Sequence, residues 1–148
     1  MPIKRERPAT MRLTTFTDYG LRMLMRMAAE PGRAFSTAAL AEEFGLKRNH
    51  LAKIMQRLAQ AGFVATRRGS GGGAVLARPA REIRLGALVA ALEQGQPLVE
   101  CFAAGGDCPI DGRCRLKARL RRAEAAFLAD LDRSTLADIA LTAASTLR

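Results

Sequence analysis

Two helical segments joined by a short turn at a glycine, with a hairpin pattern directly after them, constrain the fold of this chain most. Ser36 is a favoured N-cap for a short helix over residues 37–44, and Gly45 supplies the turn that ends it. A second helix is predicted from about Lys47 to Ala61. Its apolar residues recur at i, i+3, i+4 and i+7, at Leu51, Ile54, Met55 and Leu58. This succession predicts a helix-turn-helix unit whose second helix packs on a core through one face.

The hydrophobic period changes from helix-like to strand-like after Gly62. Residues 63–68 and 74–77 predict two short strands, and the glycine-rich run 69–73 predicts a tight turn between them. A hairpin after a helix-turn-helix is a wing, so the expected fold class is mainly α with a small β-hairpin wing. The glycine run lacks the GKS or GKT ending of a phosphate-binding loop, and no helix follows it at once. Nucleotide binding is therefore not expected.

Charge divides the chain into two unlike parts. Residues 1–84 hold 16 Lys and Arg against 6 Asp and Glu, whereas residues 85–148 hold 8 of each kind. A basic part joined to a neutral part is typical of a DNA-binding unit attached to a sensing or pairing unit, although RNA and membrane surfaces also attract basic chains. The chain has one Tyr, six Phe and no Trp, and this scarcity of aromatic platforms argues against an RNA-binding module.

Hydrogen-bond donors cluster in the first turn and on the outer face of the second helix of the unit. Such a helix enters the major groove with its N-terminal end first. Arg48, Asn49 and His50 are expected to reach base edges, and Lys53 and Arg57 suit phosphates. The full set of predicted DNA-binding residues, with two arginines from the wing, is Lys47, Arg48, Asn49, His50, Lys53, Arg57, Arg67 and Arg68. The alternatives are a solvated basic helix face and, for His50, a metal ligand.

Further helices are predicted on both sides of the winged unit. The first begins at Thr15, which is spaced from Asp18 as in a capping box, and ends before Pro31. Another covers Leu85–Glu93. A last short helix begins at Thr135, which with Asp138 forms a second box-like cap, and the tail after Ala143 is expected to fray.

A longer helix is predicted from about Arg115 to Asp132. Four residues on it form a coiled-coil-like seam, Leu116, Leu120, Ala123 and Phe127. The seam packs either on its own domain or on a second copy of the chain. The second copy is favoured because a winged-helix protein needs a dimer to read a palindromic operator, so this segment is expected to be a dimerisation helix.

Four parts make up the predicted domain organisation. They are a disordered basic extension (1–10), a winged helix-turn-helix DNA-binding domain (11–84), a short helix with a three-cysteine cluster-binding loop (85–114), and a dimerisation helix with a C-terminal helix (115–148). The patterned sequence begins at Met11, so a translation start assigned too far upstream also explains the extension. With no run of 18 apolar residues and no secretory signal, we expect a cytoplasmic protein.

All three cysteines fall in one loop that also contains glycines and a proline. Six residues separate Cys101 from Cys108, and five separate Cys108 from Cys114. An odd number of thiols argues against a disulfide framework, and the gaps are wider than those of most structural zinc sites. The pattern favours an iron-sulfur cluster on three thiolates, with a fourth ligand from elsewhere. The alternative is that three small side chains pack a loop.

Several motifs together resemble one known family. Over roughly residues 11–141, the chain resembles the winged-helix iron-sulfur regulators. The motifs that carry this resemblance are MRLTTFTDYGLRMLMRMA, KRNHLAKIMQRLAQAGFV, RGSGGG, the cysteine loop with CRLK, and FLADLDRSTLADI. That family contains the IscR-like regulators and the NsrR-like repressors, which sense nitric oxide. An IscR-like protein is expected to have a histidine shortly after the third cysteine, and here Lys117 stands three residues beyond Cys114. The resemblance therefore favours the NsrR-like branch.

The resemblance implies a homodimer in which Cys101, Cys108 and Cys114 of one protomer and Asp18 of the partner subunit are metal ligands. The implied cofactor is a 4Fe-4S cluster, with 2Fe-2S as the alternative. The implied function is repression that nitric oxide relieves at genes for nitric oxide detoxification and nitrosative stress. Two rivals are a regulator that senses iron-sulfur supply or redox state and a zinc- or thiol-based repressor. The chain offers no recognisable catalytic motif, so an enzyme is not expected.

Overall fold

The computed structural model describes residues 12–103 and 105–142. Its helices and strands are α1 (Thr15–Ala28), α2 (Thr37–Phe44), α3 (Arg48–Gln60), β1 (Val64–Arg67), β2 (Gly73–Leu76), the 3-10 turn η1 (Ala80–Glu82), α4 (Leu85–Leu92), the 3-10 turn η2 (Glu100–Phe102), α5 (Arg115–Leu131) and α6 (Leu136–Ile139). The predicted fold class, mainly helical with a two-stranded wing, is confirmed. The predicted disordered extension and frayed tail lie outside the described residues.

The helix-turn-helix is formed by α2 and α3, as predicted. The Ser36 hydroxyl accepts a hydrogen bond from the backbone N–H of Ala39 at 3.0 Å, which satisfies one of the free donors at the start of α2. Gly45 follows α2 with φ of 63°, a left-handed conformation that glycine adopts without strain. The second helix begins at Arg48 and ends at Gln60, within one residue of the predicted bounds.

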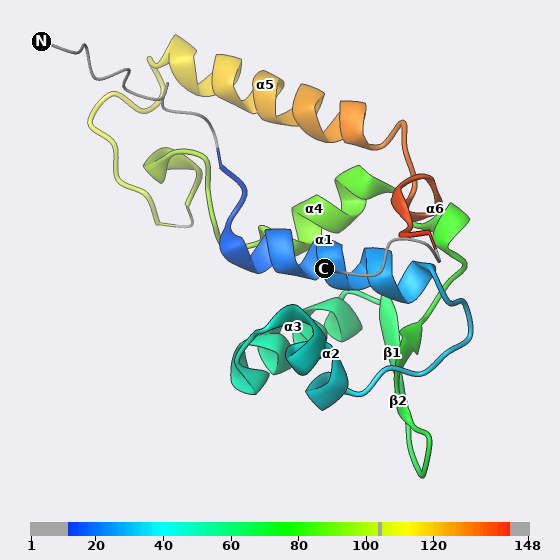
Figure 1. Ribbon diagram of the computed structural model, residues 1–148. Coiled ribbons are helices and arrows are strands. Elements are labelled where there is room, and N and C mark those ends of the chain that lie inside the picture. Colours follow the sequence, from blue (N-terminus) through cyan, green and yellow to red (C-terminus); the bar gives the residue numbers. More distant parts are fainter. Residues whose placement is uncertain (1–11, 104, 143–148) are drawn as a thin grey trace, which may run out of the picture.

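The core lies where α1, α3 and α4 meet, and α6 covers one end of it (Figure 1). The predicted apolar face of α3 is buried, at Leu51, Ile54, Met55 and Leu58. A close approach of α1 depends on Gly20, because a Cβ there would lie 3.0 Å from the Leu92 side chain and 3.4 Å from Ile54. Helix α3, the second helix of the helix-turn-helix and the predicted recognition helix, and helix α4 are therefore packed against the same turn of α1.

The wing is an antiparallel hairpin with Val64 opposite Leu76 and Arg67 opposite Gly73. Phe35 adds a third short rung, since its backbone N–H and carbonyl each bond to Ala74 at 2.8 Å. Gly73 is needed there, because a Cβ would collide with the Phe35 backbone. The second strand begins at Gly73, one residue before the predicted bound, because Gly73 pairs with Arg67.

The predicted capping box at the start of α1 is wrong. The N-cap is Thr14, whose hydroxyl accepts from the backbone N–H of Thr17 at 3.2 Å. In a capping box, an acidic residue of the same helix accepts from the N-cap residue. Here the acceptor is Glu93, which follows α4, and it accepts from Thr14 N at 2.7 Å and from Thr14 Oγ1 at 3.0 Å. Asp18 is left free to pair with Arg22. The spacing suggested Asp18 as the carboxylate at this cap, whereas tertiary packing places Glu93 there.

Helix α5 lies outside the core and runs along α4 (Figure 1). Its C-terminal end is held where Gly86 meets Leu128, and the backbone N–H of Ala87 donates to Asp132 Oδ1 at 3.0 Å. The predicted cap of α6 is confirmed, because Thr135 N donates to Asp138 Oδ2 at 2.7 Å in a complete capping box. Within the described residues, no helix is long and apolar enough to cross a membrane.

Candidate DNA-binding surface and cysteine loop

Four predicted DNA-binding side chains at the start and on the outer face of α3 are free for a ligand. Lys47 precedes the helix as its N-cap residue, and Arg48, Asn49 and Lys53 follow on its outer face. All four are exposed, and none makes a side-chain hydrogen bond or ion pair with another described residue. Lys47 does not cap α3 with its side chain, so the first backbone N–H groups also remain available to an anion.

His50 and Arg57 belong to the same predicted set, but their side chains turn toward the protein. The His50 ring is half-buried and meets the edge of Tyr19 at 6.0 Å between ring centroids, with Phe16 at 6.4 Å. Arg57 Nη1 donates to the carbonyl oxygen of Gln94 at 3.2 Å. Sequence spacing places both residues on α3, yet only the packing of α1 and α4 shows which way they point.

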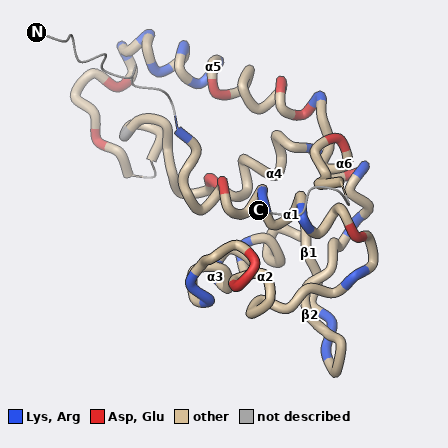
Figure 2. Tube along the Cα trace, viewed as in Figure 1, with Lys and Arg blue, Asp and Glu red and all other residues tan. Residues whose placement is uncertain are grey.

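The wing carries a second group of cations. Arg68 is exposed at the start of the turn, and Arg67 reaches the carbonyl of Gly32 at 3.5 Å. Arg78 lies over the Phe63 ring at 5.3 Å. Figure 2 shows basic residues at the start of α3 and along the hairpin, both on the side of the molecule opposite α5. One face therefore carries the two elements with which a winged helix touches DNA.

The cysteine loop connects the end of α4 to the start of α5. Cys101 lies in η2, Cys114 is the N-cap residue of α5, and the carbonyl of Cys108 accepts from Asp111 N at 3.0 Å. All three thiols are free and half-buried. Among the described residues, no three His, Cys, Asp or Glu side chains lie close enough together to hold a metal ion. Three free thiols on one loop nevertheless match the donor chemistry of an iron-sulfur cluster, although the arrangement does not gather them.

Two contacts tie the cysteine loop to the first turns of α5. Lys117 Nζ pairs with Asp111 Oδ1 at 2.8 Å, and the Arg121 guanidinium lies 4.5 Å from the centre of the Phe102 ring. The hydrogen bond from Lys117 lowers the pKa of the Asp111 carboxyl, and the same contact raises the pKa of the Lys117 ammonium. Lys117, noted for its place after the third cysteine, therefore holds the turn between Cys108 and Cys114.

Asp18 lies in the first turn of α1 and does not join its own chain's cysteines in a ligand group. Both of its carboxylate oxygens accept from Arg22, at 3.0 and 2.9 Å, and the side chain is about half exposed. Such an exposed pair within one helix is worth little, so another positive or metal partner competes easily for the carboxylate.

A groove of about 1240 Å³ separates α5 from α4 and the start of α1. Three of the four predicted seam residues line it, namely Leu120, Ala123 and Phe127. The fourth, Leu116, is 62% exposed. These four seam residues form an apolar strip along α5, and the described part of the chain leaves much of this strip uncovered.

Comparison with known proteins gives one family. Residues 13–142 match the Rrf2 family, described as iron-dependent transcriptional regulators. CymR (YrzC), the global cysteine regulator of B. subtilis, is 26% identical, with 88% of this chain and 97% of that chain covered and a TM-score of 0.66. The oxidized form of Staphylococcus aureus CymR is 28% identical, with 88% and 96% covered and a TM-score of 0.64. IscR of T. potens is 27% identical, with 87% and 85% covered and a TM-score of 0.66. The chain therefore belongs to the Rrf2 family of transcriptional regulators.

Proposed function

We propose that this regulator is a homodimeric, DNA-binding repressor that senses nitric oxide through an iron-sulfur cluster. The observation that carries the proposal is the cysteine loop, in which three free, half-buried thiols lie between α4 and α5 of an Rrf2 protein. The free donors at the start of α3 and the arginines of the wing supply the DNA contacts. The protein acts in the cytoplasm, where its operator lies, and it is not an enzyme.

Cys101, Cys108 and Cys114 hold the cluster together with Asp18 of the partner subunit. The cluster is 4Fe-4S in this proposal, with 2Fe-2S as the alternative. A carboxylate is a weaker ligand than a thiolate for such iron, so Asp18 would be the ligand most easily displaced. When bound, the cluster supplies iron with which nitric oxide reacts. The chain's own part is to order the cysteine loop against the first turn of the partner's α1.

Dimerisation through α5 gives the apolar strip a partner. The first half of α5 carries five cations without an acid, Arg115, Lys117, Arg119, Arg121 and Arg122, and its second half carries Glu124 and Asp130. An antiparallel second α5 places opposite charges against each other while covering Leu116 and Phe127. The two α3 helices of such a dimer read the half-sites of a palindrome, which lie about 34–36 Å apart.

Release of the operator follows when the loop loses its order. If nitric oxide reacts with the bound cluster, Asp18 of one protomer and the cysteine loop of the other would no longer be linked, and the two α3 helices would no longer be held at the operator spacing. A coupling of about 2 kcal/mol already changes affinity about thirtyfold. The genes under control are those for nitric oxide detoxification and nitrosative stress.

A thiol-based repressor is the second candidate. The three thiols are free and ungathered in the described chain, and one similar structure is the oxidized form of CymR. A regulator of iron-sulfur supply is a further alternative within the family, since IscR is also structurally similar.

One set of measurements separates these candidates. We would select an operator from random duplexes with the anaerobically reconstituted protein, then follow its visible spectrum, its iron and sulfide content and operator binding as nitric oxide is added stoichiometrically. Bleaching of a cluster band in step with loss of binding supports the nitric oxide sensor. A cluster that leaves DNA binding unchanged by nitric oxide favours sensing of cluster supply, and a colourless protein whose binding responds only to thiol oxidants favours the thiol-based repressor.

A further inference from the structure

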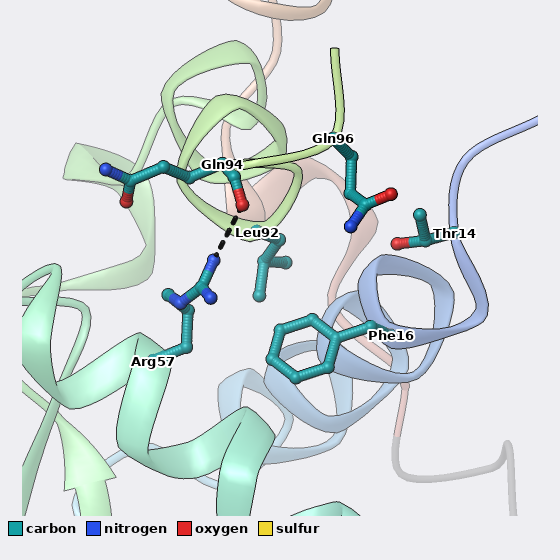
Figure 3. A pocket seen from close by; sticks show the side chains of 6 residues that line it. All are labelled: Thr14, Phe16, Arg57, Leu92, Gln94 and Gln96. Atoms are coloured by element: carbon teal, nitrogen blue, oxygen red, sulfur yellow. Dashed lines mark hydrogen bonds between the residues drawn. The ribbon is translucent and has the colours of Figure 1, made fainter. Parts of the chain in front are cut away.

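Arg57 lies on the recognition helix but reaches the end of α4, where the cysteine loop begins. Its Nη1 atom donates to the carbonyl oxygen of Gln94 at 3.2 Å and approaches that of Ala91 at 3.5 Å. Its guanidinium also lies 5.5 Å from the centre of the Phe16 ring on α1. Figure 3 shows the Arg57 side chain pointing at the Gln94 carbonyl beside Phe16 and Leu92. One side chain of α3 thus contacts both the end of α4 and the start of α1.

The chemistry of this contact favours an arginine. Ala91 lies in the last turn of α4 and Gln94 just beyond it, at the end of the helix where carbonyls lack partners within the helix and the dipole is negative. A cationic donor satisfies them better than a neutral one, and the aromatic face of Phe16 stabilises the same charge. Arg57 is half-buried, so its charge is committed to this junction. A phosphate contact competes directly with these bonds.

The neighbouring residue ties the same point of the chain to α1. Glu93 accepts from Thr14 N and Thr14 Oγ1 at the first turn of α1, four residues before Asp18. Glu93 and Gln94 therefore join the start of α1 and the recognition helix to the segment that leads, seven residues later, to Cys101. We name Thr14, Arg57, Glu93 and Gln94 the junction.

The junction has room to change. An open surface pocket of about 230 Å³ lies beside it, lined by Thr14, Phe16, Arg57, Leu92, Gln94 and Gln96. Figure 3 shows Gln96 and Thr14 on one side of this space and Arg57 on the other. Arg57 bonds to backbone carbonyls here, so the position of the chain at Gln94 fixes the geometry of these bonds.

We propose that Arg57 is a positioning residue that passes the state of the cysteine loop to the recognition helix, rather than a phosphate contact. This inference rests on the proposed function, because it assumes that DNA binding depends on the loaded loop. The ordered loop holds Gln94 in place, Gln94 holds Arg57, and Arg57 sets how α3 lies against α1 and α4.

The test compares Arg57→Met and Arg57→Lys with Lys53→Met, which removes a charge from an exposed position one turn earlier on α3. For each protein, the cluster-loaded and cluster-free forms are titrated with operator and with random duplex over a range of salt, and the thermal midpoint of the cluster-free form is recorded. The quantity of interest is the ratio of operator affinities of the loaded and free forms.

Both Arg57 variants are expected to lower this ratio about tenfold, because coupling between sites of this kind is typically worth 5–150-fold. Arg57→Lys keeps the charge but loses the planar fork, and its random-DNA affinity and salt dependence stay at the wild-type values. Lys53→Met keeps the wild-type ratio and reduces the salt slope by about one. This pattern supports the positioning role.

Two results overturn it. If Arg57→Met keeps the wild-type ratio and reduces the salt slope as Lys53→Met does, Arg57 is a phosphate contact. If Arg57→Met does not fold, a wild-type ratio in Arg57→Lys rejects the inference by itself. If the loaded and free forms of the wild-type protein bind the operator equally well, the proposed function itself is rejected. If the wild-type forms differ in operator affinity and the Arg57 variants keep the same ratio, only the role of Arg57 is rejected.

Discussion

Asn49 stands in the first turn of α3 with an exposed side chain and no partner among the described residues, so it is free to pair with a base edge. An amide that bonds a base in two places discriminates by about 1–3 kcal/mol. We expect Asn49→Ala to weaken operator binding by about tenfold or more while random-duplex binding stays nearly unchanged. Fluorescence anisotropy with both duplexes at one salt concentration measures this, and equal losses on the two duplexes contradict base readout.

Helix α1 depends on an N-cap that two distant parts of the chain share. Thr14 caps Thr17 N, and its own N–H and hydroxyl are bound by Glu93. Thr14→Ala is expected to cost about 1–2 kcal/mol of unfolding free energy, the usual range for a lost cap. Urea unfolding of the cluster-free protein gives the value. Thr37→Ala is a matched control, because Thr37 follows the α2 cap without being it, and a loss as large there would contradict a specific role for Thr14.

The link between the cysteine loop and α5 is pH-dependent in a known direction. Asp111 has a lowered pKa in the folded chain because it accepts a hydrogen bond from Lys117. The stability that the pair contributes is therefore fully present above the ordinary carboxyl pKa of 3.8 and is lost as pH falls through the folded pKa. Lys117 has a raised pKa, so the same pair is lost at the alkaline end only as pH rises above 10.5 and through the folded pKa. The contribution of the Asp111–Lys117 pair to stability is therefore independent of pH between these limits.

We expect Lys117→Met to loosen the turn around Gly112, whose N–H donates to Asp111 at 3.1 Å. The hydrogen-exchange protection of Gly112 is expected to fall in the variant at neutral pH. The difference from the wild type is expected to disappear as Asp111 becomes protonated in acid. A difference that persists below the folded pKa of Asp111 would show that the ion pair does not hold this turn.

At the scale of the whole molecule, the apolar strip of α5 decides whether the regulator works as a pair. Phe127 is 36% exposed and lines the groove beside α4. Phe127→Asp is expected to weaken dimerisation about a hundredfold, because a two-fold interface loses the apolar contact twice and gains a buried charge. Sedimentation equilibrium measures the change. Ala125→Asp adds the same charge to an exposed position on another side of α5, and an equal loss there would contradict the proposed interface.

The sequence by itself determined what depends on neighbouring residues. The bounds of α2 and α3 follow from the Ser36 cap, the left-handed Gly45 and the helical period, and the α6 box follows from Thr135 and Asp138. Each feature is complete within one helix and its caps, so spacing alone is enough. The three thiols share a loop for the same reason, since they are close in the chain.

Only the tertiary structure decided which partners the functional side chains have. Glu93 binds the cap of α1 from 79 residues away, and Arg57 meets the end of α4 from 37 residues away. Contacts over such long separations leave no periodic pattern in the sequence from which they could be predicted. Asp18 and His50 likewise have neighbours that their spacing does not reveal, Arg22 for Asp18 and the aromatic rings of α1 for His50. Periodicity specifies which face a residue lies on, whereas its partner depends on how whole helices pack, and that is a property of the folded core.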